Sequence, residues 1–299
     1  MRLYLLFLCG LIGPVLTAQL PVAVVNYEVD LSETVGKSSV EVASAIEFSE
    51  RKGLLIVRAY TDSAWGNFIL DTGAAGLVLN ASTAPDPTRS AAGLFGSTGA
   101  TACTVQRFIW QGITRRDVPA LRIDLSHIER SLGLELRGLF GYELLHRHLL
   151  AIDLPNQTVT LNPPEAKLTG LVYKLRSRGQ LPVIKMRING KVHRFGIDSG
   201  ASVNVLDGHT LDRLPTSAYC EKAPRLISGA GRRSVALRTV ATSEFIVGEG
   251  DVAAQIWSVA DLSHLRQTQD VALDGILGRP FLEQHRVVID YPGRKVWID

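Results

Sequence analysis

Short runs of alternating or continuous apolar residues, broken by glycine, proline and polar turns, make up most of the chain. The runs Leu54–Tyr60 and Asn67–Leu70 predict one pair of β-strands, and the runs Leu181–Ile188 and Lys191–Ile197 predict another. Asn189–Gly190, which separates the second pair, is typical of a two-residue hairpin turn. The pattern therefore predicts a mostly β protein.

Helical spacing is confined to two short segments, Tyr142–His148 and Arg279–His285. Pro280 at the start of the second segment suits the first turn of a helix. Each segment is followed by an aliphatic run that predicts a strand, Leu149–Leu154 in one case and Val287–Tyr291 in the other. The same order of elements thus occurs twice.

The two parts of the chain are also similar in sequence. Residues 124–161 align without a gap with residues 261–298, and about a third of the aligned residues are identical. Residues 68–80 align with residues 195–207, and a loop between the two blocks absorbs the difference in spacing. This internal duplication predicts two similar lobes. We expect an N-terminal extension at 19–50, an N-terminal lobe at 51–162, a connector at 163–180 and a C-terminal lobe at 181–299.

Composition excludes some partners. The 299 residues carry 32 Lys+Arg against 29 Asp+Glu, a net charge of +3, and no segment concentrates the excess. Nucleic acid and anionic membrane surfaces are therefore not expected partners. Beyond Cys9, the chain has only Cys103 and Cys220, which form neither a disulfide framework nor a metal-binding spacing. The sequence leaves open whether these two are bridged.

The N-terminus resembles a secretory signal peptide. Arg2 precedes an apolar stretch from Leu3 to Leu16 that ends in small residues, with cleavage expected near Ala18. We therefore expect residues 1–18 to be removed and the protein to be secreted or periplasmic. The alternative is an uncleaved leader that anchors the chain, but Pro14 interrupts the run before the roughly 20 apolar residues that a bilayer requires.

Two matched motifs carry the candidate chemistry. Asp71–Ala74 (Asp-Thr-Gly-Ala) and Asp198–Ala201 (Asp-Ser-Gly-Ala) each follow an apolar strand, and each has a downstream companion of two apolar residues and a glycine, Leu139–Gly141 and Ile276–Gly278. A single Asp-Thr-Gly is an ordinary turn. Two copies in register, with two companions, resemble the bilobal aspartic peptidases of the retropepsin-like and pepsin-like superfamily. The alanine after each glycine is more similar to the retroviral-type branch.

This resemblance implies an all-β, pseudo-two-fold bilobal fold of two barrel-like lobes, with a catalytic pair formed by Asp71 and Asp198 in a central cleft. Attack of water on an amide needs one carboxylate and one carboxylic acid side by side. In aspartic peptidases the two carboxyls, ~3 Å apart, share one proton. The proton belongs to the pair, so neither residue is assigned as the acid. The resemblance implies a peptide substrate, no metal or organic cofactor, and a monomer, because one chain contributes both aspartates.

The resemblance also assigns supporting roles around the pair. Thr72 and Ser199 are expected to hydrogen-bond to the opposite loop, and Gly73 and Gly200 to leave space beside the carboxyls. Substrate would lie extended beneath hairpins at 93–99 and 228–231. The candidate substrate-binding residues are Phe95, Gly96, Gly229 and Gly231.

Other functions find less support in the sequence. Ser-His-Asp catalysis lacks a Gly-x-Ser-x-Gly motif. His146 and His148 have no further residues at ligand spacing to complete a metal site. Glycosidase carboxyls lie ~5 Å or more apart, on unrelated loops. The remaining alternative is a catalytically silent protein of the same fold that binds peptides. Residues 19–50 are also too few for a large inhibitory prodomain.

Overall fold

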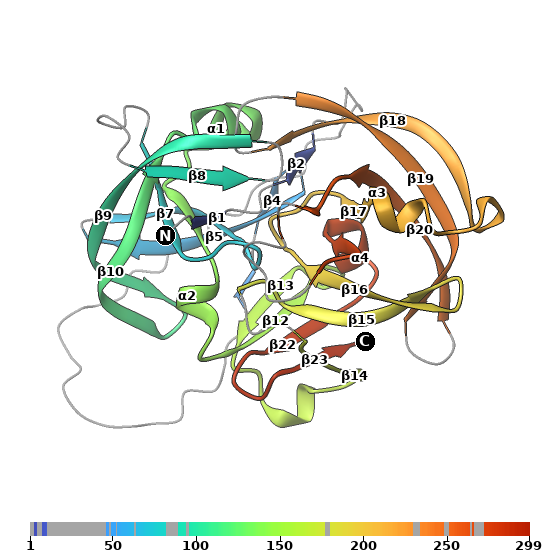
Figure 1. The fold of residues 1–299 in the computed structure, drawn as a ribbon. Helices are drawn as coiled ribbons and strands as arrows, with labels where there is room; N and C mark the ends of the chain where they lie inside the picture. The colour runs from blue at the N-terminus through green and yellow to red at the C-terminus, as the bar shows by residue number, and fades with distance from the viewer. Residues whose placement is uncertain are drawn as a thin grey trace.

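The computed structural model describes residues 3–4, 8–10, 46–47, 49–51, 53–62, 64–81, 89–93, 96–176, 180–229, 234–247, 251–263, 265 and 272–299. Strands predominate in this part of the chain and the helices are short, so the predicted mostly β class is confirmed. Figure 1 shows one lobe built mainly from the first half of the chain, a second built mainly from the other half, and a smaller sheet beneath both.

The first lobe is a nine-stranded sheet that curls on itself, because β9 pairs with β5 as well as with β8 and β10. Its strands, in spatial order, are β1 (Leu3–Tyr4), β8 (Arg89–Gly93), β9 (Gly96–Trp110), β10 (Ile113–Ile123), β7 (Leu77–Asn80), β11 (Gly138–Phe140), β6 (Ala64–Leu70), β5 (Leu54–Thr61) and β4 (Ser49–Arg51).

The second lobe is an eight-stranded sheet with the same arrangement, closed by the pairing of β15 with β19. Its strands, in spatial order, are β15 (Val183–Ile188), β16 (Lys191–Ile197), β21 (Gly275–Leu277), β17 (Asn204–Asp207), β20 (Asp251–Ala260), β19 (Ser234–Val247), β18 (Tyr219–Gly229) and β2 (Leu8–Gly10). The predicted hairpin turn between β15 and β16 has positive φ at Asn189 and Gly190, as the Asn-Gly pair requires.

A six-stranded sheet joins the halves, because β12 from the first pairs antiparallel with β22 from the second. Its order is β14 (Leu171–Lys174), β23 (Lys295–Ile298), β22 (Val287–Asp290), β12 (Leu149–Asp153), β13 (Thr158–Leu161) and β3 (Ile46–Glu47). The segment expected to be a connector thus contributes β14, and the N-terminal extension contributes β3 and, in the first lobe, β4. The valine-rich start of that extension lies outside the described residues.

The helices differ from prediction in two ways. The predicted segments form only the single turns α2 (Tyr142–Leu145) and α4 (Arg279–Leu282). A longer helix, α1 (Ser126–Leu132), was not predicted; Ile128 and Leu132 form its buried face. The remaining helices are α3 (Gly208–Leu211) and the 3₁₀ turns η1 (Glu165–Lys167) and η2 (Thr216–Ala218).

Aromatic clusters fill the centre of each lobe. Phe140, on the strand that carries the first companion motif, packs edge-to-face against Phe68, Phe108 and Trp110. In the second lobe the buried aromatic residues are Phe195, Phe245, Trp257 and Phe281. Each cluster packs beside the strand that leads into one Asp loop, so the core holds the loop bases rigidly.

Matching polar contacts fix the same loop in both lobes. The Leu125 backbone N–H donates to Asn80 Oδ1 at 2.9 Å, and the Leu262 N–H donates to Asp207 Oδ1 at 3.0 Å. These residues occupy equivalent positions in the two aligned blocks. In each lobe they tie the end of the strand after the Asp loop to a distant turn.

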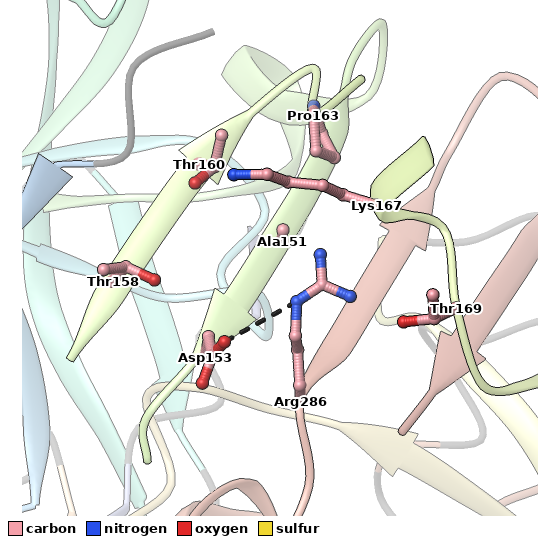
Figure 2. Close-up of a pocket in the computed structure, with 8 residues that line it drawn as sticks. All are labelled: Ala151, Asp153, Thr158, Thr160, Pro163, Lys167, Thr169 and Arg286. Carbon is pink, nitrogen blue, oxygen red and sulfur yellow. Dashed lines mark ion pairs between the residues drawn. The ribbon is translucent and has the colours of Figure 1, made fainter. Parts of the chain in front are cut away.

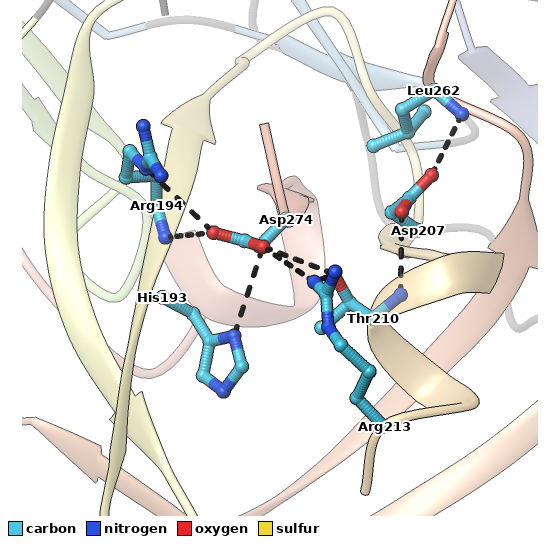
Figure 3. Close-up of polar contacts among 7 residues, drawn as sticks. All are labelled: His193, Arg194, Asp207, Thr210, Arg213, Leu262 and Asp274. Carbon is cyan, nitrogen blue, oxygen red and sulfur yellow. Dashed lines mark hydrogen bonds and ion pairs between the residues drawn. The ribbon is translucent and has the colours of Figure 1, made fainter. Parts of the chain in front are cut away.

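The second lobe adds a charged cluster around Asp274, just before β21 (Figure 3). The carboxylate accepts from the Arg194 backbone N–H at 2.8 Å and the Thr210 hydroxyl at 3.0 Å. Arg213 lies 3.3 Å and His193 3.8 Å away. Burial by itself would raise the pKa of Asp274, but these hydrogen bonds outweigh it and lower the pKa to about 2.

We predict that Asp274→Asn lowers the stability of the protein above pH 4 and removes part of its acid sensitivity. A carboxyl with pKa 3.8 unfolded and about 2 folded contributes stability above pH 3.8 that is lost as the pH falls through 2. The contribution corresponds to about 2 kcal/mol. Urea unfolding from pH 2 to pH 7 measures it, with exposed Asp212→Asn as the control; equal effects of the two substitutions would contradict this role for Asp274.

Candidate active site

The two Asp loops lie directly after β6 and β16, and both aspartate side chains are fully buried. The Asp71 backbone N–H donates to the carbonyl of Phe140 at 3.0 Å, and the Asp198 N–H donates to the carbonyl of Leu277 at 2.9 Å. The companion strands β11 and β21 therefore pass behind the loops and hold their backbones. The structure places both companion motifs in the same relation to their Asp loop.

Four hydrogen bonds cross between the loops. The Thr72 N–H donates to Ser199 Oγ at 3.0 Å, and the Ser199 N–H donates to Thr72 Oγ1 at 2.9 Å. Each hydroxyl in turn donates to the opposite strand, Thr72 to the Ile197 carbonyl and Ser199 to the Leu70 carbonyl. All four are buried, so neither loop can shift without leaving polar groups unpaired.

The glycines fit each carboxyl against the opposite loop. A Cβ atom at Gly73 would lie 2.6 Å from Asp198 Oδ2, and one at Gly200 would lie 2.6 Å from Asp71 Oδ1, both too close for any side chain. Each glycine N–H donates to the aspartate of its own loop at 2.8 Å. The structure therefore brings together all six loop residues predicted from the sequence.

Burial and mutual contact perturb the two carboxyls. Burial raises the pKa of Asp71 well above its ordinary value, and the neighbouring Asp198 carboxyl raises it further. Burial also raises the pKa of Asp198, to about 6, against the opposing effect of its hydrogen bonds. Two buried carboxyls in contact hold one proton between them over a range of pH. The pair can thus supply a base and an acid at once.

Comparisons with known proteins agree with this geometry. A family model described as "Aspartyl protease" matches residues 184–281, which include Asp198 and its companion motif. The crystal structure of an aspartic proteinase from Irpex lacteus is similar over 86% of this chain and 96% of that chain, with a TM-score of 0.53 and 13% sequence identity. Residues 184–281 thus match the aspartyl protease family, and the chain shares the fold of an aspartic proteinase. No curated protein sequence matches it.

One aromatic group near the two aspartates was not predicted from the sequence. The Tyr291 hydroxyl is buried without a hydrogen-bond partner among the described residues, and its ring packs on Tyr142 at 5.7 Å between centroids. Tyr142 in turn donates its N–H to the Ala74 carbonyl of the first Asp loop. Burial raises the pKa of Tyr291, and the charges of Tyr142 and both aspartates raise it further. Tyr291 therefore lies within electrostatic reach of the pair.

The Oδ2 atoms of Asp71 and Asp198 are also buried without a hydrogen-bond partner in the described part of the chain. Buried carboxylate oxygens normally have partners, so an unpaired atom on each carboxyl requires an explanation. These two oxygens are the unpaired atoms of the pair.

Two hairpin edges that are candidates for peptide binding come from equivalent strands, β8 and β18. Gly96 begins β9, opposite Gly93 of β8, and Gly229 ends β18. The other predicted substrate-binding residues, Phe95 and Gly231, lie outside the described residues. Both edges carry a strand from the N-terminal segment: β1 pairs parallel with β8, and β2 pairs antiparallel with β18.

The sequence left open whether Cys103 and Cys220 are bridged; in the structure they are free thiols on strands of different lobes.

Among the described residues, no group of three or more His, Cys, Asp or Glu side chains is arranged to hold a metal ion. No helix in the described ranges is long and apolar enough to span a bilayer.

Proposed function

We propose that the protein is an aspartic endopeptidase that hydrolyses peptide bonds with water activated between Asp71 and Asp198. The observation that supports this most strongly is the pair itself: two fully buried carboxyls, held by crosswise hydrogen bonds, with one free oxygen on each. A pair of this kind is suited to acid–base chemistry, because its shared proton can be given and replaced within one turnover.

In the proposed reaction, the ionised carboxyl takes a proton from water as the water oxygen attacks the peptide carbonyl carbon. The protonated carboxyl gives its proton to the carbonyl oxygen, which leaves a neutral tetrahedral diol. The C–N bond then breaks as the amine nitrogen receives a proton from the pair, and one diol hydroxyl returns its proton. The products are a carboxylic acid and an amine, and the pair again holds one proton. The proposal assigns no role to a metal or an organic cofactor.

We propose that the substrate binds as an extended strand, adding to the edges of β8 and β18 by backbone hydrogen bonds. The pairings of β1 and β2 support this, since two pieces of one chain already pair with these edges. A peptide that crosses a two-fold axis runs parallel to one of two equivalent strands and antiparallel to the other, as β1 and β2 do. Because one chain provides both Asp loops, we propose a monomeric enzyme.

We also propose that residues 1–18 are a signal peptide that is removed near Ala18, so that the protein acts outside the cytoplasm. The apolar leader and the small residues at its end support this proposal. N-terminal sequencing of protein purified from its own host tests it. An intact Met1 would contradict it and would favour an anchored chain.

A chain that keeps its leader is expected to be less active than one that begins at Gln19. In the leader-containing chain, β1 and β2 occupy both strand edges, and an attached segment competes with substrate at an effective concentration near the millimolar range. We expect removal of residues 1–18 to raise kcat/KM at least about tenfold at micromolar substrate. A control chain with residues 3–10 replaced by a Gly-Ser repeat should match the shortened one. Equal activity of all three chains would contradict this role of the leader.

The alternative function is a silent peptide-binding protein, and one experiment separates the two. The mature chain is incubated with an unbiased peptide library from pH 3 to pH 8, with and without pepstatin and with and without a chelator. The proposal predicts cleavage that pepstatin blocks and the chelator does not. Peptide binding without cleavage at any pH would establish the alternative.

A further inference from the structure

A hollow of about 340 Å³ lies on the six-stranded sheet (Figure 2). None of its lining residues belongs to an Asp loop. They come from β12 and β13, from the connector around η1, and from the residue before β22. The lining residues are Ala151, Asp153, Thr158, Thr160, Pro163, Lys167, Thr169 and Arg286.

Arg286 is the more buried of the two cations that line this hollow. Its Nε lies 3.6 Å from Asp153 Oδ2, and its side chain is only 18% exposed. Figure 2 shows the two terminal guanidinium nitrogens directed away from Asp153, toward the side where Lys167 and Thr169 lie. No hydrogen bond or ion pair occupies those two nitrogens among the described residues. A largely buried guanidinium therefore presents free donors to the hollow.

The Asp153 carboxylate is not available to bind a metal ion in the hollow. Its carboxylate accepts from the Asn156 backbone N–H at 3.1 Å and from the Asn156 side-chain amide at 3.0 Å, in addition to the Arg286 contact. Its oxygens are thus already occupied, and the hollow is not suited to a metal ion.

The other polar groups add donors. Lys167 has no ion pair within the described part of the chain, and Figure 2 shows its ammonium group on the same side as the Thr160 hydroxyl. Thr158 and Thr160 lie on the same face of β13, because residues two apart in a strand share a face. The Thr169 hydroxyl already donates to the Asp299 carboxylate at 2.6 Å, so its proton is not available to a ligand in the hollow.

We propose that this hollow binds a small organic anion through a phosphate or carboxylate group, held by Arg286, Lys167 and Thr160. A guanidinium and an ammonium that face one space match an oxyanion in charge and in donor geometry. A cavity of about 340 Å³ is at the lower end of the range for small-molecule sites, so the anion is expected to carry an organic part. Bound there, the anion would join the connector to the sheet that unites the two halves.

The test uses inorganic phosphate and malonate as probes, added to the mature chain at constant ionic strength with chloride as the reference. At least one probe is expected to bind saturably in calorimetry and to raise the Tm with concentration. Lys167→Gln should weaken that binding about tenfold or more, whereas Lys185→Gln, which removes an exposed lysine from the second lobe, should leave it unchanged. Arg286→Lys, which keeps the charge near Asp153 and loses the planar fork, should weaken it as well.

The proposal fails if neither probe binds saturably, or if Lys167→Gln and Lys185→Gln weaken binding equally. The second result would show only a diffuse effect of net charge. Neither measurement requires peptidase activity, so the outcome is independent of the proposed function.

Discussion

Asp198→Asn and Asp71→Asn are each expected to abolish peptide hydrolysis while the protein stays folded. Asparagine has nearly the shape of aspartate and still accepts the glycine N–H of its own loop, but it cannot take or give the shared proton. General acid–base catalysis contributes about 10²–10⁴-fold to a rate, and each substitution removes it at both steps, so we expect a loss of about 10³-fold or more. The measurement is kcat/KM on the best substrate from the peptide library.

The same two variants are expected to be more stable than the wild type at neutral pH. A carboxyl whose pKa is 3.8 unfolded and about 6 folded binds its proton more tightly in the native state. Its contribution to the free energy of unfolding is present below pH 3.8 and is lost as the pH rises through 6. The free energy lost is about 3 kcal/mol. Asp198→Asn removes this loss. Thermal unfolding at pH 4 and pH 7 should therefore show an advantage of the variant that grows with pH, and an advantage that shrinks would contradict burial of the pair.

Gly200→Ala and Gly73→Ala are expected to have the second largest effect. The new methyl group would lie about 2.6 Å from the opposite carboxyl, so one loop must move. A displacement of about 1 Å at reacting groups lowers rates about 100-fold, and overpacking of this kind destabilises a core by about 1–3 kcal/mol. Activity and urea unfolding measure the two effects.

Gly208→Ala provides the matched control for these substitutions. Its added methyl group would meet nothing closer than 4.0 Å, and its backbone does not need a positive φ. We expect nearly normal activity and stability for this variant. If Gly200→Ala behaved in the same way, the two carboxyls would not be in the close arrangement described.

The sequence predicted the aspartic peptidase fold because its internal duplication presents the Asp motif, the companion motif and the strand pattern twice. Leu181–Ile188 and Lys191–Ile197 alternate strongly around an Asn-Gly turn, and the observed strands β15 and β16 match them closely. The Asp loops were recognisable because their chemistry requires fixed residues at fixed spacing. Glycines that touch the opposite carboxyl leave no freedom for substitution.

Other features depend on contacts that a linear pattern does not encode. Helix α1 is only two turns long, and its signals, a buried Ile128–Leu132 pair and Gly133 in the left-handed conformation at its end, are weak within a strand-rich chain. Tyr291 directly follows β22, far along the chain from both Asp loops, and only the six-stranded sheet brings it near the pair. The anion site likewise combines Lys167 and Arg286 through tertiary packing.

The most direct test of the shared-proton pair is the pH dependence of kcat/KM for the mature wild-type chain. We predict a bell-shaped profile, because cleavage requires one protonated and one ionised carboxyl. Burial raises both pKa values, so the acid limb should lie above pH 3.8 and closer to pH 6, and the basic limb should lie higher still. A profile that is flat, or that follows a single titration, would contradict the pair as the source of catalysis.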